Sequence, residues 1–371
     1  MSRIYLVAGE ASGDNHGAAL MEALRRLQPD VELSGRGGPR MKALAGEPFQ
    51  NWIDQAGVVG LWEVVKHYPY FRREFARTLH EIATAKPAAV VLIDYPGFNL
   101  RLARALREKS LGGKIIYYIS PQVWAWNRRR IPQMARWLDL MLCIFPFEAG
   151  LYEQSGLRTV FVGHPMIDNL AAHRSDRVRE PDLVGLFPGS RRREVGQLFP
   201  ILLEVVRALR AQQPGLRFEI AAASEALAEI MRAELARASL GDVAILVGQA
   251  AQTMQRSAVG IVASGSATLE AAFFRLPFVL VYKVAPLTYL AGRMLIAVKY
   301  LGMPNVLANR EIVPEFIQHE ARAGAIAAEV MRLLNDPERR PRMVAELDAV
   351  IAQLGPGGAS DAAARALLEA I

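Results

Sequence analysis

The chain has 371 residues, which at roughly 100–200 residues per domain predicts two domains. Hydrophobic residues make up 52% and charged residues 22%, so each half can bury a core, and an intrinsically disordered chain is excluded. Lysine and arginine number 44 against 37 aspartates and glutamates, and this net charge of +7 favours an anionic partner such as phosphate, anionic lipid or nucleic acid. The single cysteine, Cys143, excludes an intramolecular disulfide and a cysteine-based metal cage.

Residues 1–8 run from one charge directly into a strand-like segment, without the long apolar stretch and cleavage site of a signal peptide. The longest uncharged stretches, 243–255 and 257–269, are shorter than the roughly 20 residues of a membrane-spanning helix. We therefore expect a cytoplasmic protein that is able to touch a membrane from that side.

Short aliphatic runs alternate with helical patterns along most of the chain. The predicted strands are 4–8, 31–34, 90–93, 115–119, 140–144 and 159–162, followed by a second series at 183–187, 218–221, 243–247, 260–263 and 278–281. Predicted helices between them include 13–27, 70–85, 197–212, 225–238 and 266–274. Strands that are apolar on both faces and separated by helices predict a parallel sheet covered on both sides. Two such series predict an α/β protein with two doubly wound, parallel-sheet domains.

The domain boundaries follow from changes in this pattern. We predict an N-terminal domain at 1–168, a polar linker containing Pro181 at 169–182, and a second domain at 183–345. After residue 281 the pattern is purely helical, with helices expected at 286–300, 321–334, 337–354 and 361–371. The helical tail 346–371 is expected to pack back onto the N-terminal domain or onto a second subunit.

Both halves begin with a strand, a turn of small residues and a helix N-terminus, at 4–13 and 183–191. Such a turn brings backbone N–H groups and the positive end of a helix close to an anion. Because ligands of these sheets bind at the carboxyl ends of the strands, two facing domains predict a ligand in the cleft between them. Standard nucleotide motifs, a serine-hydrolase elbow and paired histidines are absent from the sequence, and the glycines at 35–38 are interpreted as a loop.

Two segments of the second half are compatible with an anion. Arg191, Arg192 and Arg193 crowd a helix start, which is unfavourable for cations unless an anion binds there; the alternative is a solvated run of charge. The turn Ser264-Gly265-Ser266 precedes Glu270. This glutamate either caps its own helix or accepts hydrogen bonds from ribose hydroxyls, and the pattern alone does not separate these readings.

Three segments of the first half carry further candidates. Asp94 ends a strand, so it either acts as a general base or caps the following helix; Asp14 and His16 are rival bases. The segment 120–130 sets two tryptophans beside three arginines, which suits a sugar phosphate, a lipid head group or single-stranded nucleic acid, although packing of one tryptophan is the plainer reading. The aromatic and basic segment 62–75 is either an interfacial patch or core.

Nine motifs, in order along nearly the whole chain, resemble the lipid-A-disaccharide synthase family of inverting glycosyltransferases, which have two Rossmann-like domains (the GT-B fold). They are V-A-G-E-A-S-G-D at 7–14, G-P-R-M at 38–41, I-D-Y-P-G-F-N at 93–99, S-P-Q-V-W-A-W at 120–126, F-P-F-E at 145–148, G-H-P-M at 163–166, P-G-S-R at 188–191, S-G-S-A-T-L-E at 264–270 and P-N-V-L-A-N-R-E at 304–311. P-G-S-R alone is a weak signal, but the series together is highly specific.

The resemblance implies transfer of diacylglucosamine from UDP-2,3-diacylglucosamine to 2,3-diacylglucosamine 1-phosphate (lipid X). The products are a β-1,6-linked disaccharide 1-phosphate and UDP. It also implies a peripheral enzyme on the cytoplasmic face of the inner membrane, a homodimer that exchanges C-terminal helices, and neither a cofactor nor a metal ion nor a nucleic-acid partner. The alternatives are a GT-B enzyme acting on UDP-N-acetylglucosamine, either a murein-precursor transferase or a 2-epimerase, and a non-catalytic protein that binds anionic lipid.

The resemblance also assigns roles to residues. Asp94 matches the general base and Arg191 the arginine on the UDP phosphates, while Gly97 stands where many relatives show a second aspartate. The other residues of the donor site are expected to be Ser190, Ser264, Gly265, Ser266, Glu270 and Asn305. The residues expected at the acceptor or facing the cleft are Glu10, Ser12, Gly13, Asn99, Gln122 and Trp124.

Overall fold

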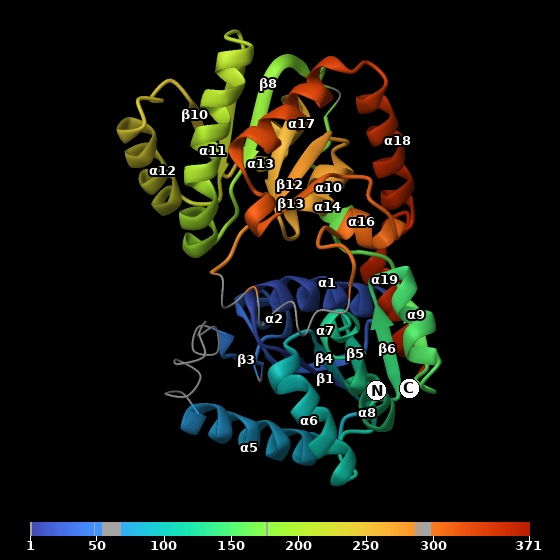
Figure 1. The fold of residues 1–371 in the computed structure, drawn as a ribbon. Helices are drawn as coiled ribbons and strands as arrows, with labels where there is room; N and C mark the ends of the chain where they lie inside the picture. The colour runs from blue at the N-terminus through green and yellow to red at the C-terminus, as the bar shows by residue number, and fades with distance from the viewer. Residues whose placement is uncertain (1, 48, 54–67, 176, 286–288, 290–297) are drawn as a thin grey trace. The chain divides into compact units, whose positions relative to one another are not determined.

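The computed structural model describes residues 2–47, 49–53, 68–175, 177–285, 289 and 298–371 (Figure 1). The chain divides into two compact units. The N-terminal unit comprises Met1–Pro165 together with Leu354–Ile371, and the C-terminal unit comprises Met166–Gln353. The N-terminal unit is therefore built from two separate stretches of the chain.

The described strands of the N-terminal unit form a seven-stranded sheet in the order β3-β2-β1-β4-β5-β6-β7, and every pairing is parallel. The strands are β1 (Arg3–Ala8), β2 (Glu32–Gly37), β3 (Gln50–Asn51), β4 (Ala89–Ile93), β5 (Lys114–Tyr118), β6 (Leu140–Cys143) and β7 (Thr159–Phe161). Its helices are α1 (Ala11–Leu27), α2 (Pro39–Ala45), α5 (Tyr68–Ala85), α6 (Pro96–Glu108), α7 (Val123–Trp126), α8 (Ile131–Trp137), α9 (Pro146–Glu153) and α19 (Ala359–Leu368), with the 3₁₀ turn Arg128–Arg130 before α8.

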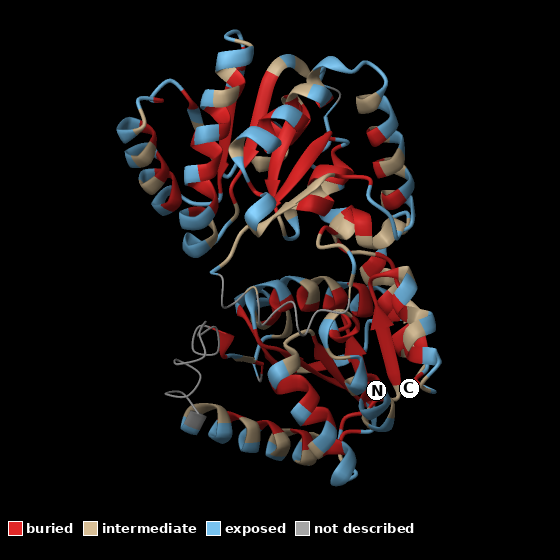
Figure 2. Cartoon of the chain, viewed as in Figure 1, coloured by how far each residue is buried: buried red, intermediate tan, exposed pale blue. Residues whose placement is uncertain are grey.

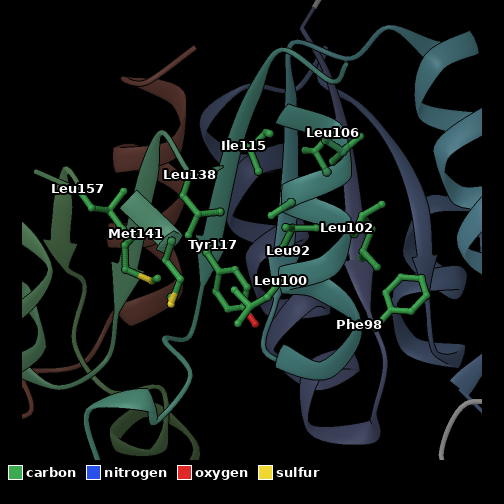
Figure 3. Close-up of a cluster of buried hydrophobic side chains, with 14 of the residues drawn as sticks. Leu92, Phe98, Leu100, Leu102, Leu106, Ile115, Tyr117, Leu138, Met141 and Leu157 are labelled. Carbon is green, nitrogen blue, oxygen red and sulfur yellow. The ribbon is translucent and has the colours of Figure 1, made fainter. Parts of the chain in front are cut away.

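The core of the N-terminal unit lies between this sheet and α6. Leu102 and Leu106 of α6 are buried against residues of the central strands such as Leu92 (Figure 3). These leucines are fully buried, and each buried side chain of this size contributes about 1.5–3 kcal/mol. Every residue of β4 is buried, which explains its uninterrupted aliphatic sequence, because a central parallel strand has helices on both faces.

The described strands of the C-terminal unit form a six-stranded parallel sheet in the order β10-β9-β8-β11-β12-β13. They are β8 (Glu180–Phe187), β9 (Arg217–Ala222), β10 (Ala244–Val247), β11 (Ser257–Ala263), β12 (Phe278–Tyr282) and β13 (Glu315–Ile317). The helices are α10 (Met166–Ala171), α11 (Arg192–Gln212), α12 (Glu225–Arg237), α13 (Ala250–Arg256), α14 (Ala267–Phe273), α16 (Met303–Ala308), α17 (Ala323–Asn335) and α18 (Arg339–Ala352), with a short 3₁₀ turn at Gln318–Glu320. Buried residues follow the strands and exposed residues the outer helix faces (Figure 2).

The predicted fold class is confirmed, since both units are parallel α/β sheets with alternating helices. Two local predictions are wrong. The chain after residue 281 is not purely helical, because Glu315–Ile317 forms β13 beside β12. The glycine-rich segment 35–38 is not a loop, because its first three residues belong to β2. Gly35 has φ +143° there, and a Cβ on it would lie 2.0 Å from the carbonyl oxygen of Leu6, so only glycine fits.

The predicted linker 169–182 is also wrong at both ends. It contains the end of α10 and the start of β8. Between them, the half-buried Arg179 donates hydrogen bonds of 2.7 Å to the carbonyl oxygens of Met254 and Ser257. The segment is therefore fastened to the C-terminal unit instead of forming a free connection.

The C-terminal tail contributes to both units. The predicted boundary at residue 346 falls inside α18, which belongs to the C-terminal unit, and only residues from Leu354 onward join the N-terminal unit. There α19 packs along α1, and Arg26 pairs with Asp361 at 2.6 Å. Exchange of these helices between subunits stays a prediction. Within the described residues, no helix combines the length and the apolar character needed to cross a bilayer.

Candidate active site

In each sheet the strand order reverses at one place, between β1 and β4 in the N-terminal unit and between β8 and β11 in the C-terminal unit. Ligands of such sheets bind beyond the carboxyl ends of the strands at this reversal. Ala8 lies beside Ile93 in the first pair, and Phe187 lies beside Val262 in the second. The turns that follow these four strands contain most of the residues predicted from the sequence, so each unit offers one candidate half-site.

Asp94 lies directly after β4 in a backbone conformation that is unusual for a non-glycine residue. Its φ is +46°, and that of Tyr95 is +48°. The carbonyl oxygen of Asp94 accepts hydrogen bonds from the Tyr117 hydroxyl at 2.6 Å and the Asn99 amide at 2.8 Å, and its N–H donates to the Tyr118 carbonyl at 3.0 Å. Left-handed positions persist where the surroundings fix them, and they cluster at functional sites. These hydrogen bonds therefore fix the backbone of Asp94 at the end of the strand.

The electrostatic environment of Asp94 suits a general base. Burial and, to a lesser extent, the negative charge of Glu10 raise the pKa of the Asp94 carboxyl to about 6, while a hydrogen bond from the Tyr95 N–H opposes the shift. A base works best when its pKa lies near the working pH. Glu10 is the N-cap residue of α1 and is exposed, so the predicted first turn and the Asp94 turn share one electrostatic environment.

The ring of Tyr95, in the turn after β4, packs directly against the turn after β1. A Cβ on Gly9 would lie 2.1 Å from Cδ1 of the Tyr95 ring, so residue 9 has to be glycine for the ring to stay in place. The indole of Trp52 meets the same ring edge-on, with 6.3 Å between ring centroids, and donates to the Ala8 carbonyl oxygen at 2.7 Å. Tyr95, Tyr117 and Trp52 support the site and were missed at the sequence level. The Tyr-Tyr ending of an otherwise aliphatic strand at 114–118 was the available signal.

The surroundings of the two rival bases, Asp14 and His16, make each of them a weaker candidate than Asp94. Asp14 is 3% exposed, and its carboxylate accepts hydrogen bonds from the backbone N–H groups of Gly38, Arg40 and Met41 at 2.9–3.0 Å. It therefore caps α2. His16 lies on α1, where burial lowers the pKa of its imidazole and so makes it a weaker proton acceptor than a free histidine. Asp94 remains the best candidate.

The structure divides the remaining predicted acceptor residues into two groups. Asn99 and Trp124 are buried, and Asn99 holds the turn after β4 while the Trp124 indole donates to Glu148 Oε1 at 2.9 Å. These two side chains serve the fold, which corrects the expectation that they face a substrate. Gly13 is buried against Ala8. Ser12 and Gln122 are exposed.

The aromatic and basic segments are partly core. Trp126, in contrast to Trp124, is 42% exposed, with the Arg130 guanidinium 5.2 Å from its ring. In the segment 62–75, residues 62–67 lie outside the described residues. In α5 the rings of Phe71 and Phe75 pack against the core cluster, and Glu74 forms a buried ion pair with Arg36 at 2.7 Å. The described part of that segment therefore packs one face against the core and leaves Arg72 and Arg73 exposed.

In the C-terminal unit, Ser190 and Arg191 follow β8 and precede α11. Gly189 has φ +102°, a conformation that glycine adopts most readily, and Arg191 is the N-cap residue. Its guanidinium is 79% exposed and pairs with Glu194 at 2.9 Å. An exposed pair of this kind contributes only about 0–1 kcal/mol, so a phosphate with two negative oxygens competes for Arg191 at little cost.

The turn after β11 supplies the second part of this half-site. Gly265 has φ +144°, and Ser264 and Ser266 are partly or fully exposed. Burial raises the pKa of the Glu270 carboxyl, while a hydrogen bond with the Ser266 side chain lowers it. Glu270 thus contacts Ser266, the N-cap residue of its own helix. This contact agrees with the interpretation of Glu270 as a capping residue.

Asn305 was expected in the donor site, but its side-chain amide has no free hydrogen-bonding position for a nucleotide. It is fully buried, and its amide donates to the Val313 carbonyl at 2.7 Å and to Glu315 Oε1 at 2.8 Å. Its oxygen accepts from the N–H groups of Ile312 and Val313. Both amide hydrogens and both acceptor positions are used, so this side chain fixes the segment before β13.

The same architecture is found in solved structures of nucleotide-sugar enzymes. The S. aureus MnaA–UDP co-structure superposes with a TM-score of 0.66 at 14% identity, covering 100% of this chain and 98% of that one. The UDP-GlcNAc 2-epimerase from Neisseria meningitidis bound to UDP-GlcNAc gives 0.64 at 12%, with 100% of both chains covered. The calicheamicin glycosyltransferase CalG4 gives 0.55 at 12%, covering 100% and 98%. These likenesses define the fold as that of the GT-B glycosyltransferases and epimerases.

Sequence comparison identifies the family within this class. The family model for lipid-A-disaccharide synthetase matches residues 4–367. The lipid-A-disaccharide synthase of Geobacter sulfurreducens is 42% identical, covering 99% of this chain and 97% of the relative. That of Koribacter versatilis is 39% identical, covering 98% and 96%, and lipid-A-disaccharide synthase 1 of Legionella pneumophila (strain Philadelphia 1) is 39% identical, covering 93% and 91%. The chain belongs to the lipid-A-disaccharide synthase family and is a glycosyltransferase, as its motifs predict.

Proposed function

We propose that this enzyme transfers diacylglucosamine from UDP-2,3-diacylglucosamine to 2,3-diacylglucosamine 1-phosphate, forming a β-1,6-linked disaccharide 1-phosphate and UDP. Family membership over 4–367 supports the reaction. The observation that carries the chemistry is the Asp94 carboxylate, fixed at the sheet reversal with a pKa raised to about 6. A protein that only bound lipid would not need such a group.

The proposed reaction is a single displacement with inversion. Asp94 accepts the proton of the acceptor 6-hydroxyl. At the same time the oxygen of that hydroxyl forms a bond to the anomeric carbon of the donor. The bond from that carbon to the UDP oxygen breaks, and its electron pair stays on the diphosphate. Positioned proton transfer of this kind contributes roughly 10²–10⁴ in rate.

The leaving diphosphate needs positive charge as it departs. In the C-terminal unit, the N-terminus of α11 and the guanidinium of Arg191 are proposed to supply it. Ser190 and the turn 264–266 are proposed to hold the same nucleotide. Within the described residues, no group of three or more His, Cys, Asp or Glu is arranged to hold a metal ion, and we propose a metal-independent reaction.

The decisive experiment is a disaccharide-forming assay with the full chain, both acylated substrates and EDTA. Formation of disaccharide and UDP in the chelator supports the proposal. Preference for UDP-N-acetylglucosamine over the acylated donor would instead indicate a 2-epimerase or murein-precursor type of activity. Loss of activity in EDTA that magnesium restores would contradict the metal-independent mechanism.

Arg191 gives a second test of the donor half-site. Arg191→Ala is expected to weaken UDP binding by about 1.5–3 kcal/mol, as expected for a hydrogen bond to a charged group. Titration calorimetry measures this loss, with Arg193→Ala, two positions along in the same helix, as the matched control. Equal losses in both variants would indicate a general charge effect instead of a specific contact.

We also propose that the enzyme acts as a homodimer, peripheral on the cytoplasmic face of the inner membrane. The substrates carry acyl chains, whose burial in a bilayer is worth about 0.8 kcal/mol per methylene, so an enzyme that meets them works at the membrane surface. The exposed Trp126 beside the exposed Arg128 and Arg129 supports this proposal. Vesicle flotation and sedimentation equilibrium test the two statements separately.

A further inference from the structure

A small pocket lies beside the Asp94 turn, between α6 and α8 of the N-terminal unit. Its volume is about 190 Å³. Leu100, which is 5% exposed, and the half-buried Trp137 are apolar parts of its lining, and Gly97 opens it toward the start of α6. A Cβ on Gly97 would meet no atom within 4 Å, so this end of the pocket is unobstructed.

The pocket is positively charged. Arg101, Arg104 and Arg130 all line it, and its lining contains no acidic residue. Arg104 pairs with Glu108 at 2.7 Å. Among the described residues, none forms a hydrogen bond or ion pair with the side chain of Arg101 or Arg130, and the Arg130 guanidinium rests only against the Trp126 ring. Unpaired guanidinium groups around a hollow repel one another until an anion enters, and their planar donors match phosphate oxygens.

The position of the pocket relates it to the chemistry of the site. Gly97 is three residues beyond Asp94, and Arg101 follows one helical turn later on α6, about 6 Å along the helix axis. Gly97, which lines the pocket, therefore stands between Asp94 and Arg101 along the chain. An acceptor with its 6-hydroxyl at Asp94 can therefore direct its 1-phosphate toward Arg101.

We propose that Arg101 and Arg130 bind the 1-phosphate of the acceptor and make the enzyme select a phosphorylated acceptor sugar. This inference rests on the proposed function and deepens it, because it assigns the acceptor's charged group to named residues. The two arginines are binding residues that determine specificity, whereas the proton transfer stays with Asp94.

The test compares two acceptors, diacylglucosamine 1-phosphate and the same sugar without its phosphate, at saturating donor in detergent micelles. In Arg101→Ala and Arg130→Ala, KM for the phosphorylated acceptor is expected to rise roughly ten- to a hundred-fold. KM for the donor and for the phosphate-free acceptor is expected to stay unchanged, so the preference between acceptors disappears. Arg136→Ala, an exposed arginine on α8 outside the pocket lining, is the matched control and should behave as the unmodified enzyme.

The phosphate of a membrane lipid or a free phosphate ion has the same chemistry, and two further arms separate these sources. Binding to phosphatidylglycerol vesicles is measured for all variants, and inorganic phosphate is added to the kinetic assay. Retained vesicle binding together with a lost acceptor preference supports the assignment. Lost vesicle binding with a retained preference, or competition by inorganic phosphate that is equal for both acceptors, overturns it.

Failure of this inference is distinguishable from failure of the proposed function. If the unmodified enzyme joins the substrates but the two variants affect both acceptors equally or neither, only the pocket assignment is overturned. If the unmodified enzyme forms no disaccharide from either acceptor, the proposed function fails and the assignment with it. Arg101 is exposed and Arg130 is half-buried, so thermal unfolding of each variant is measured to exclude loss of the fold.

Discussion

Asp14 and Asp94 follow neighbouring strands of one sheet, yet the structure uses them in opposite ways. The Asp14 carboxylate accepts three backbone hydrogen bonds from the start of α2 and is almost completely buried. The Asp94 carboxylate accepts one backbone hydrogen bond, from Tyr95, and its pKa is raised. Its backbone carbonyl and N–H, in contrast, are held firmly.

This difference shows how one fold separates a structural carboxylate from a reactive one. Three backbone donors occupy the Asp14 carboxylate, and its burial keeps a substrate hydroxyl away from it. A carboxylate that is fixed through its backbone and only sparsely solvated keeps the capacity for a proton from a substrate. Four substitutions test this difference between the two carboxylates.

The largest effect is expected at Asp94. Asp94→Asn removes the proton acceptor while preserving size and backbone, so turnover is expected to fall by roughly 10²–10⁴, with UDP binding and thermal stability unchanged. Initial rates and UDP titration measure the two quantities on one preparation. Unchanged turnover would show that the proton leaves by another route.

Asp14→Ala tests the other carboxylate. Three backbone N–H groups lose their acceptor, and the free energy of unfolding is expected to fall by about 1–3 kcal/mol, as measured by urea denaturation. The turnover of the folded fraction should remain. Asp14→Asn keeps one acceptor oxygen and should lose less stability. A large loss of turnover at full stability would return Asp14 to the list of candidate bases.

Glu10→Gln probes the electrostatic setting of the base. The negative charge of Glu10 raises the pKa of Asp94, so removing it lowers that pKa. Asp94 then stays ionised to lower pH, and the acid limb of the kcat/KM profile is expected to move to lower pH by less than about one unit. A shift in the opposite direction would contradict the coupling of the two turns.

Gly97→Asp should produce the smallest effect on the acid limb, of opposite sign, when it is measured with the phosphate-free acceptor, because residue 97 lines the proposed phosphate pocket. The position is exposed and its Cβ has room, and an acidic residue in the first turn of α6 is favoured by the helix dipole by about 0.3–1 kcal/mol. The added charge near Asp94 should raise the pKa of the base and move the acid limb slightly to higher pH. Gly97→Asn is the uncharged control and should leave the limb in place.

The positions of the candidate site were predictable because strand ends are visible in the sequence. An aliphatic run that ends in Asp94, or in Pro188-Gly189-Ser190, places these residues at the carboxyl edge of a sheet whatever the details of packing. The parallel α/β class followed from the same alternation. Both conclusions depend on short-range patterns.

The partners of polar side chains were not predictable in this way. The sequence shows that Asn99, Asn305 and Trp124 can donate hydrogen bonds, but only the folded chain shows that carbonyls or carboxylates already accept them. The strand Glu315–Ile317 was missed because three half-buried residues give no alternation to detect. Gly35 was misread because its role depends on the close approach of Leu6.

The packing of α19 on α1 has a consequence for the order in which the chain is completed during translation. Residues 166–353 form one continuous unit, whereas the first unit needs the segment 354–371, which is synthesised after all of the second unit. The half that is translated second is thus the first able to finish folding. Until residues 354–371 are made, α1, whose N-cap residue is Glu10, lacks its packing partner α19. The C-terminal unit can therefore be folded in a nascent chain while the N-terminal unit is still incomplete.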